Sequence, residues 1–235
     1  MTSSPAPRTN LHRWWWALWG LMAVSAIGIA AYALPPYLSG NPADSNVPID
    51  PDVALHYLSL TMHAVPGGLA LIIGPFQFMA RLRARRPKLH RVAGRVYMIS
   101  VLFASGAALF AATFSLGGLS VQIAFYLLVA GWLYTLAKAY LSIRRGQVQL
   151  HRIWLIRNYA LTFAAVSLRV YLLTGLMLKQ SVATAVPFEE IYNLSVWASI
   201  LVNVAVAEYF IIQRTLAPLA RRRRLGEAVP AAEPS

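Results

Sequence analysis

The sequence predicts an all-α fold, a polytopic membrane bundle of about six transmembrane helices with both termini in the cytoplasm. Of its 235 residues, 58% are hydrophobic and 12% are charged, whereas about 25% of residues are charged in a typical soluble domain. The apolar residues form runs of about 20 or more, the length that a helix needs to cross about 30 Å of hydrocarbon. The basic residues are confined to segments between these runs, which is typical of a multi-pass membrane protein.

Reading the apolar runs against the thickness of a bilayer predicts one transmembrane domain over residues 14–214. A short cytoplasmic segment, residues 1–13, precedes it, and a basic and then disordered cytoplasmic tail, residues 215–235, follows it. The expected spans cover residues 14–34, 53–80, 92–114, 119–142, 153–178 and 190–213.

The connections between spans alternate in charge, which predicts their sides of the membrane. Three segments are basic: Arg81, Arg83, Arg85, Arg86, Lys88 and Arg91; then Arg144, Arg145 and Arg152; then Arg214 and 221–224. The intervening connections hold almost no cations, and the first of them carries Asp44, Asp50 and Asp52. The positive-inside rule assigns the basic segments to the cytoplasm of a bacterial inner (plasma) membrane. The net charge of +13 is therefore a topology signal, and we expect no nucleic-acid partner.

The first span resembles a signal peptide, because Arg13 precedes an apolar stretch that ends in Ala31-Tyr32-Ala33. Its apolar run is longer than a usual signal core, and Trp14, Trp15, Trp16 and Trp19 resemble an interfacial aromatic belt. We therefore favour an uncleaved anchor.

Composition and spacing exclude several kinds of chemistry. The chain has no cysteine, so it has no disulfide, no thiolate metal site and no cysteine nucleophile. No catalytic triad, paired-carboxylate or metalloprotease spacing is present. Whether the protein is an enzyme stays open, with a redox role as one alternative.

A family resemblance rests on several short strings. These are His63, Gly74-Pro75-Phe76-Gln77-Phe78, the run from His90 to Tyr97 (HRVAGRVY), His151-Arg152, Arg157-Asn158-Tyr159 and Arg169. Together they resemble the bacterial membrane-protein family named domain of unknown function 2306, over residues 60–172. The resemblance implies several transmembrane helices and no established activity.

The second span contains the first candidate site. His56, His63, Ala70 and Gln77 recur every seven residues, which predicts a polar and small-residue stripe facing the bundle interior. Pro66 and its neighbouring glycines predict a weakened or broken helix, tolerated in a membrane where neighbours satisfy the freed carbonyls. His63 is expected near mid-membrane, where an ionisable residue indicates function unless it is a structural hydrogen-bonding residue.

A second candidate site is a basic layer one to two turns inside the cytoplasmic ends of the spans. It contains Gln77, Arg95, Lys138, Arg157 and Glu208, with Asn158 beside it and His90 and His151 at its mouth. Arg157 and Glu208 lie at similar depths on consecutive antiparallel spans, which makes them candidate partners. Its surplus positive charge must snorkel to the interface or meet an anion, such as a propionate, a phosphate or a lipid headgroup. Arg169 lies farther along the fifth span, and its expected partners are carbonyls of the second span, Tyr192, Asn193, Glu189 or Glu190.

Three hypotheses of function follow from these sites. The first is a redox protein resembling a b-type cytochrome, with haem b held by His63, His90 or His151 and its propionates by Arg95 and Arg157. The second is a transporter of a small solute or anion, lined by the broken second span. The third is a non-catalytic membrane subunit that binds anionic lipid or another membrane protein.

Overall fold

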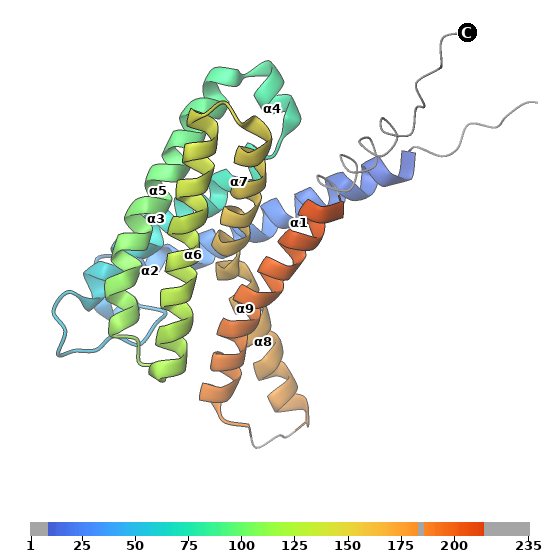
Figure 1. Ribbon diagram of the computed structural model, residues 1–235. Helices are drawn as coiled ribbons and strands as arrows, with labels where there is room; N and C mark the ends of the chain where they lie inside the picture. Colours follow the sequence, from blue (N-terminus) through green and yellow to red (C-terminus); the bar gives the residue numbers. More distant parts are fainter. Residues whose placement is uncertain (1–8, 183–185, 214–235) are drawn as a thin grey trace, which may run out of the picture. The chain divides into compact units, whose positions relative to one another are not determined.

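The computed structural model describes residues 9–182 and 186–213, and this part of the chain is almost entirely helical (Figure 1). Its helices are α1 (Thr9–Ala33), α2 (Pro35–Leu38), α3 (His56–Gln77), α4 (Ala80–Arg85), α5 (Pro87–Thr113), α6 (Gly118–Arg144), α7 (Val148–Thr162), α8 (Ala164–Val182) and α9 (Phe188–Ile211), with a 3-10 turn at Pro42–Asp44. The tail of residues 215–235 and most of the N-terminal segment lie outside the described residues.

Within the described residues, six spans are long and apolar enough to cross a membrane, which confirms the predicted fold class. They are Arg13–Ala33, His56–Gln77, Pro87–Thr113, Gly118–Arg144, Val148–Gln180 and Phe188–Ile211. The third and fifth spans begin about five residues earlier than predicted. Charged residues such as Lys88 and Arg152 end an apolar run in the sequence, but they can still form part of a helix. Pro87 at the first position of α5 suits a helix start, since its missing N–H has no partner to lose there.

The chain divides into two compact units, Met1–Val129 and Ala130–Ser235, and α6 passes from one into the other. The prediction of a single transmembrane domain over residues 14–214 stays a prediction.

In unit 1, α3 packs along α5 through small residues. Ala70 of α3 and Ala104 of α5 are fully buried, and a Cβ placed on Gly67 would lie 3.8 Å from the Cβ of Ala104. Small side chains let helix backbones approach closely inside a membrane, where packing rather than hydrophobicity drives association. The predicted stripe does face this interior, because His56 and Gln77 are also buried.

The prediction of a broken second span is wrong. The helix α3 is continuous from His56 to Gln77, with Pro66 and Pro75 inside it. Each proline removes one backbone hydrogen bond, but its fixed φ is compatible with a helix, and the close packing on α5 holds the helix together. The C-terminal end of α3 is also tied to α1, because Trp19 Nε1 donates to the carbonyl of Pro75 at 2.9 Å.

Unit 2 contains a helix break that the sequence does not signal. The fifth span is two helices, α7 and α8, which meet at Phe163 without a proline or glycine at the junction. After the break, α8 packs against α9 as an antiparallel hairpin (Figure 1), where Gly175 leaves room for the side chain of Ile191.

The charge pattern predicts the sidedness of the connections, which reporter fusions can measure. Fusions after Arg86, Gly146 and Arg224 are expected to report the cytoplasm. Fusions within residues 42–50 and at Gly117 are expected to report the outside, because these connections hold no cations. A cytoplasmic signal at Gly117 would contradict the six-span topology.

Candidate functional site

The basic end of unit 2 contains an ion pair between two membrane spans. Arg157 of α7 donates from Nε to Glu208 Oε1 at 2.5 Å and from Nη2 to Glu208 Oε2 at 2.8 Å. The guanidinium and the carboxylate thus face each other in a two-point contact, which adds geometric specificity to charge neutralisation. The similar depths of the two residues predicted this contact, and the structure confirms it.

Aromatic rings surround this ion pair and hold a further cation. The Arg157 guanidinium lies 4.5 Å from the ring centroid of Trp154, and Lys138 Nζ of α6 lies 5.8 Å from the same ring. Lys138 Nζ also lies 5.7 Å from the ring of Tyr134, which meets the indole edge to face. Because Glu208 neutralises Arg157, the ammonium of Lys138 has no carboxylate partner in this cluster among the residues that the structure describes.

A buried polar network lies deeper in the same unit. Asn158 is fully buried and donates from Nδ2 to the carbonyl of Trp132 at 2.8 Å and to Thr135 Oγ1 at 2.9 Å. Trp132 Nε1 in turn donates to Thr162 Oγ1, which donates to the Asn158 carbonyl. The network ties α6 to the last turn of α7 and has a structural role, because its members satisfy one another.

The break between α7 and α8 is bridged by a side chain from the sixth span. Asn203 of α9 donates from Nδ2 to the Ala160 carbonyl at 3.0 Å, before the break, and accepts from Ser167 Oγ at 2.8 Å, after it. Irregular backbone at membrane depth requires such partners. On the α8 side, Arg169 donates to the carbonyl of Ala165 in its own helix at 2.7 Å, a partner that the sequence does not suggest.

The histidines that were candidate haem ligands mostly contact backbone carbonyls. His63 Nδ1 lies 3.0 Å from the carbonyl oxygen of Ala104, and His151 Nδ1 lies 2.8 Å from that of Ala139. A carbonyl only accepts, so each Nδ1 carries its proton and donates. This fixes the ring and leaves Nε2 as the basic nitrogen, an orientation also common among metal-bound histidines.

The candidate haem ligands within one unit do not form a pair that fits a haem with two histidine ligands. In unit 1, His63 lies beside Ala104, whereas His90 is 14 residues earlier on α5, or about 21 Å along the helix axis. The two cannot reach one iron atom. In the described part of unit 2, His151 has no second histidine, and the described residues contain no group of three or more His, Asp or Glu that could hold a metal ion.

The remaining predicted site residues lie at the basic end of unit 1. Gln77 is buried, its Oε1 lies 3.4 Å from where a Cβ on Gly94 would be, and its Nε2 has no acceptor among the described residues. Arg83 donates to the Gln77 carbonyl at 3.1 Å. Arg95 is exposed on α5, as expected for a side chain that snorkels.

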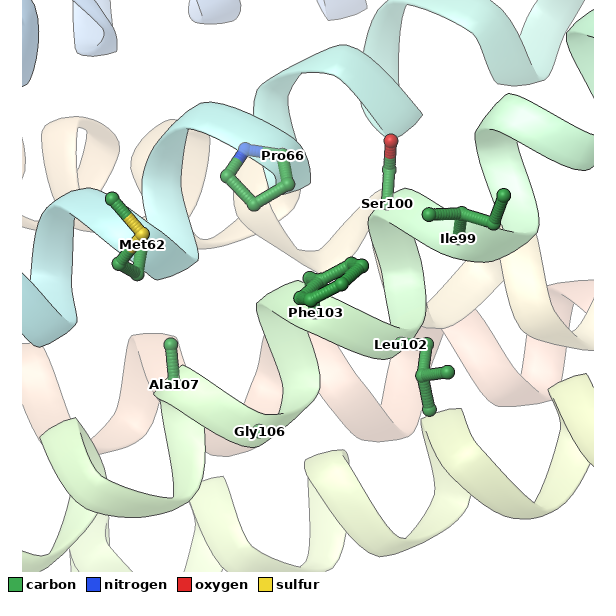
Figure 2. A pocket seen from close by; sticks show the side chains of 8 residues that line it. All are labelled: Met62, Pro66, Ile99, Ser100, Leu102, Phe103, Gly106 and Ala107. Atoms are coloured by element: carbon green, nitrogen blue, oxygen red, sulfur yellow. The ribbon is translucent and has the colours of Figure 1, made fainter.

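An open groove of about 520 Å³ lies between α3 and α5 of unit 1. Figure 2 shows Met62 and Pro66 on one side of it and the ring of Phe103 on the other. The other residues that line it are Ile99, Ser100, Leu102, Gly106 and Ala107. Nearly all of this lining is apolar, so the groove suits hydrocarbon and has no charged group to bind a polar substrate.

Several residues of the unit 2 site do not stand out in the sequence as site residues. Trp154 and Tyr134 read as ordinary apolar positions, although aromatic residues near a basic helix end are typical of a membrane interface. Asn203 could have been found, because it is a lone amide within an apolar run and must therefore have a polar partner.

These features define a polytopic helical membrane protein in which polar side chains join neighbouring spans. The chain belongs to the DUF2306 family, described as a predicted membrane protein, whose model matches residues 60–211. The match extends past the strings that suggested the family and includes Asn203 and Glu208. No curated protein and no solved structure matches the chain.

Proposed function

We propose that the protein is a non-catalytic membrane subunit that binds the phosphate headgroup of an anionic lipid at the basic end of unit 2. The observation that carries this proposal is the exposed ammonium of Lys138, held over Trp154 and Tyr134 beside an ion pair that is already neutral. Cation–π contacts hold an ammonium in place while leaving its N–H donors available to an anion.

The charge balance of this end favours an anionic partner. Residues 130–160 contain five basic side chains, Lys138, Arg144, Arg145, Arg152 and Arg157, and the facing carboxylate is Glu208. Basic pockets between transmembrane helices on the cytoplasmic side are typical sites for anionic headgroups.

The depth of Lys138 suits a phosphate rather than a soluble ligand. It lies six residues before Arg144, where α6 ends, or about 9 Å inside the helix end. Its stem of four carbons spans much of that distance, so an extended Lys138 side chain can bring the ammonium toward the headgroups. Trp154 and Tyr134 are residue types that prefer this same interfacial layer.

Replacing Lys138 tests the proposal. We expect Lys138→Gln to weaken binding of phosphatidylglycerol or cardiolipin about fivefold relative to phosphatidylcholine, since one cation near the surface contributes about 1 kcal/mol. Native mass spectrometry of the protein titrated with each lipid measures this ratio. Lys179→Gln is the matched control, because it removes the same charge at the opposite end of the unit. Equal losses in both variants, or no loss in Lys138→Gln, would contradict a site at Lys138.

Haem binding is the second candidate, favoured by the orientation of His63 and His151. In each, Nδ1 faces a backbone carbonyl, which is how many haem-ligating histidines are fixed. It would require a single histidine ligand or a ligand from elsewhere, since the candidate ligands within each unit do not form a suitable pair. An absorption spectrum of the purified protein with a Soret band would make haem binding the leading function. The transport hypothesis depended on a broken second span, and α3 is continuous.

A further inference from the structure

At the start of α3, at the end of unit 1 away from its basic loop, a histidine accepts a hydrogen bond from the preceding loop. His56, the first residue of α3, is 1% exposed. Its Nδ1 accepts the backbone N–H of Asp50 at 2.9 Å, which ties the loop of residues 39–55 to the helix. A ring nitrogen that accepts carries no proton, so His56 is neutral with its proton on Nε2.

This role differs from that of the other histidines. His63 and His151 place Nδ1 against a carbonyl oxygen, so they donate and keep the bond when the ring is protonated. In His56, protonation at Nδ1 puts two N–H groups face to face. The bond between the Asp50 N–H and the His56 ring therefore exists only while the ring is neutral.

The groups around His56 are acidic or uncharged. The charged side chains at this end of unit 1 are the loop carboxylates Asp44, Asp50 and Asp52, while α1, α2, α3 and α5 contribute none here. The Asp50 carboxylate accepts the N–H of Asp52 at 3.0 Å, and Phe114, directly after α5, contributes an uncharged ring. The described groups around the ring therefore include no basic side chain.

We propose that His56 is an acid-sensitive latch: protonation of its ring releases the loop of residues 39–55 from the start of α3. The positive-inside rule places this loop outside the cell, where the surrounding pH varies. The latch is independent of the lipid site in unit 2. It gives this family member a conformational response to acid on the side away from its basic loops.

Cysteine labelling can measure the release, because the sequence has no cysteine. Ile49→Cys places a thiol at a half-buried position beside Asp50, and Asn46→Cys places one at an exposed position of the same loop. The ratio of their reaction rates with a membrane-impermeant maleimide cancels the pH dependence of the chemistry itself. We expect this ratio to rise about fivefold from about pH 8 to about pH 5, which corresponds to the loss of one net hydrogen bond.

Two variants identify the group responsible. His56→Asn supplies an amide oxygen that accepts the Asp50 N–H without titrating, so its ratio should stay low at both pH values. His63→Asn, in the same helix, should keep the full response. A flat ratio in the otherwise unaltered chain would overturn the proposal without any change at His56. An equal rise in His56→Asn would also overturn it, by assigning the response to the carboxylates.

Discussion

Replacing Glu208 with glutamine is expected to lower the free energy of unfolding by about 1–3 kcal/mol, because it leaves the Arg157 guanidinium uncompensated within the membrane. The side chains of Arg157 and Glu208 are 27% and 37% exposed, so the cost lies above that of a surface ion pair, about 0.2–1 kcal/mol. It lies below the 3–5 kcal/mol or so of a fully buried pair. Unfolding of the purified protein by SDS in mixed micelles measures this difference.

A double-mutant cycle separates the pair from other roles of each residue. Arg157→Gln should cost a similar amount, and the double variant should be more stable than the sum of the single losses predicts, by about 1–2 kcal/mol. Glu190→Gln, near the other end of α9 and exposed, is the control and should be close to neutral. Strictly additive losses would mean that the two residues do not stabilise each other.

The spans and the faces of their helices could be predicted because they follow from hydrophobicity and periodicity. The six apolar runs predict the six spans, and the heptad spacing of His56, His63, Ala70 and Gln77 predicts a stripe toward the interior. Comparable depth on neighbouring antiparallel spans was enough to pair Arg157 with Glu208. Each of these inferences needs only the geometry of a helix and the thickness of a bilayer.

The helix break could not be predicted, because its cause is tertiary. The prolines of the second span predicted a break in α3, yet a proline is tolerated in a transmembrane helix where neighbouring groups satisfy the freed backbone. In the fifth span, no proline or glycine lies beside Phe163 to indicate a break. The tertiary contact at the junction comes from Asn203 of α9, which donates to the Ala160 carbonyl. Within α7, Thr162 donates to the Asn158 carbonyl.

The roles of the histidines also depend on contacts that the sequence does not contain. The seven-residue spacing places His56 and His63 on one stripe of one helix. His63 was the stronger candidate for a functional residue only because it lies deeper in the membrane. The distinction that matters chemically is whether Nδ1 donates or accepts, and the neighbours decide it. A carbonyl of α5 makes His63 a donor, and a loop amide makes His56 an acceptor.

Truncating Asn158 should produce the other large loss of stability. Its amide makes two hydrogen bonds to α6, at 2.8 and 2.9 Å, and its side chain is fully buried. Hydrogen bonds between membrane helices contribute about 0.6 kcal/mol each, rarely more than about 1.7, and the cavity adds a further cost. We expect Asn158→Ala to lose about 2–3 kcal/mol by SDS unfolding.

A second variant divides this loss between packing and hydrogen bonding. Asn158→Leu restores most of the side-chain volume but donates no hydrogen bond, so it should recover the cavity term and keep the loss of the two bonds. Truncation of the exposed Asn46 to alanine is the control and should change stability little. If Asn158→Leu were as stable as the unaltered chain, the network with Trp132 and Thr135 would not hold α7 to α6, and packing alone would carry that contact.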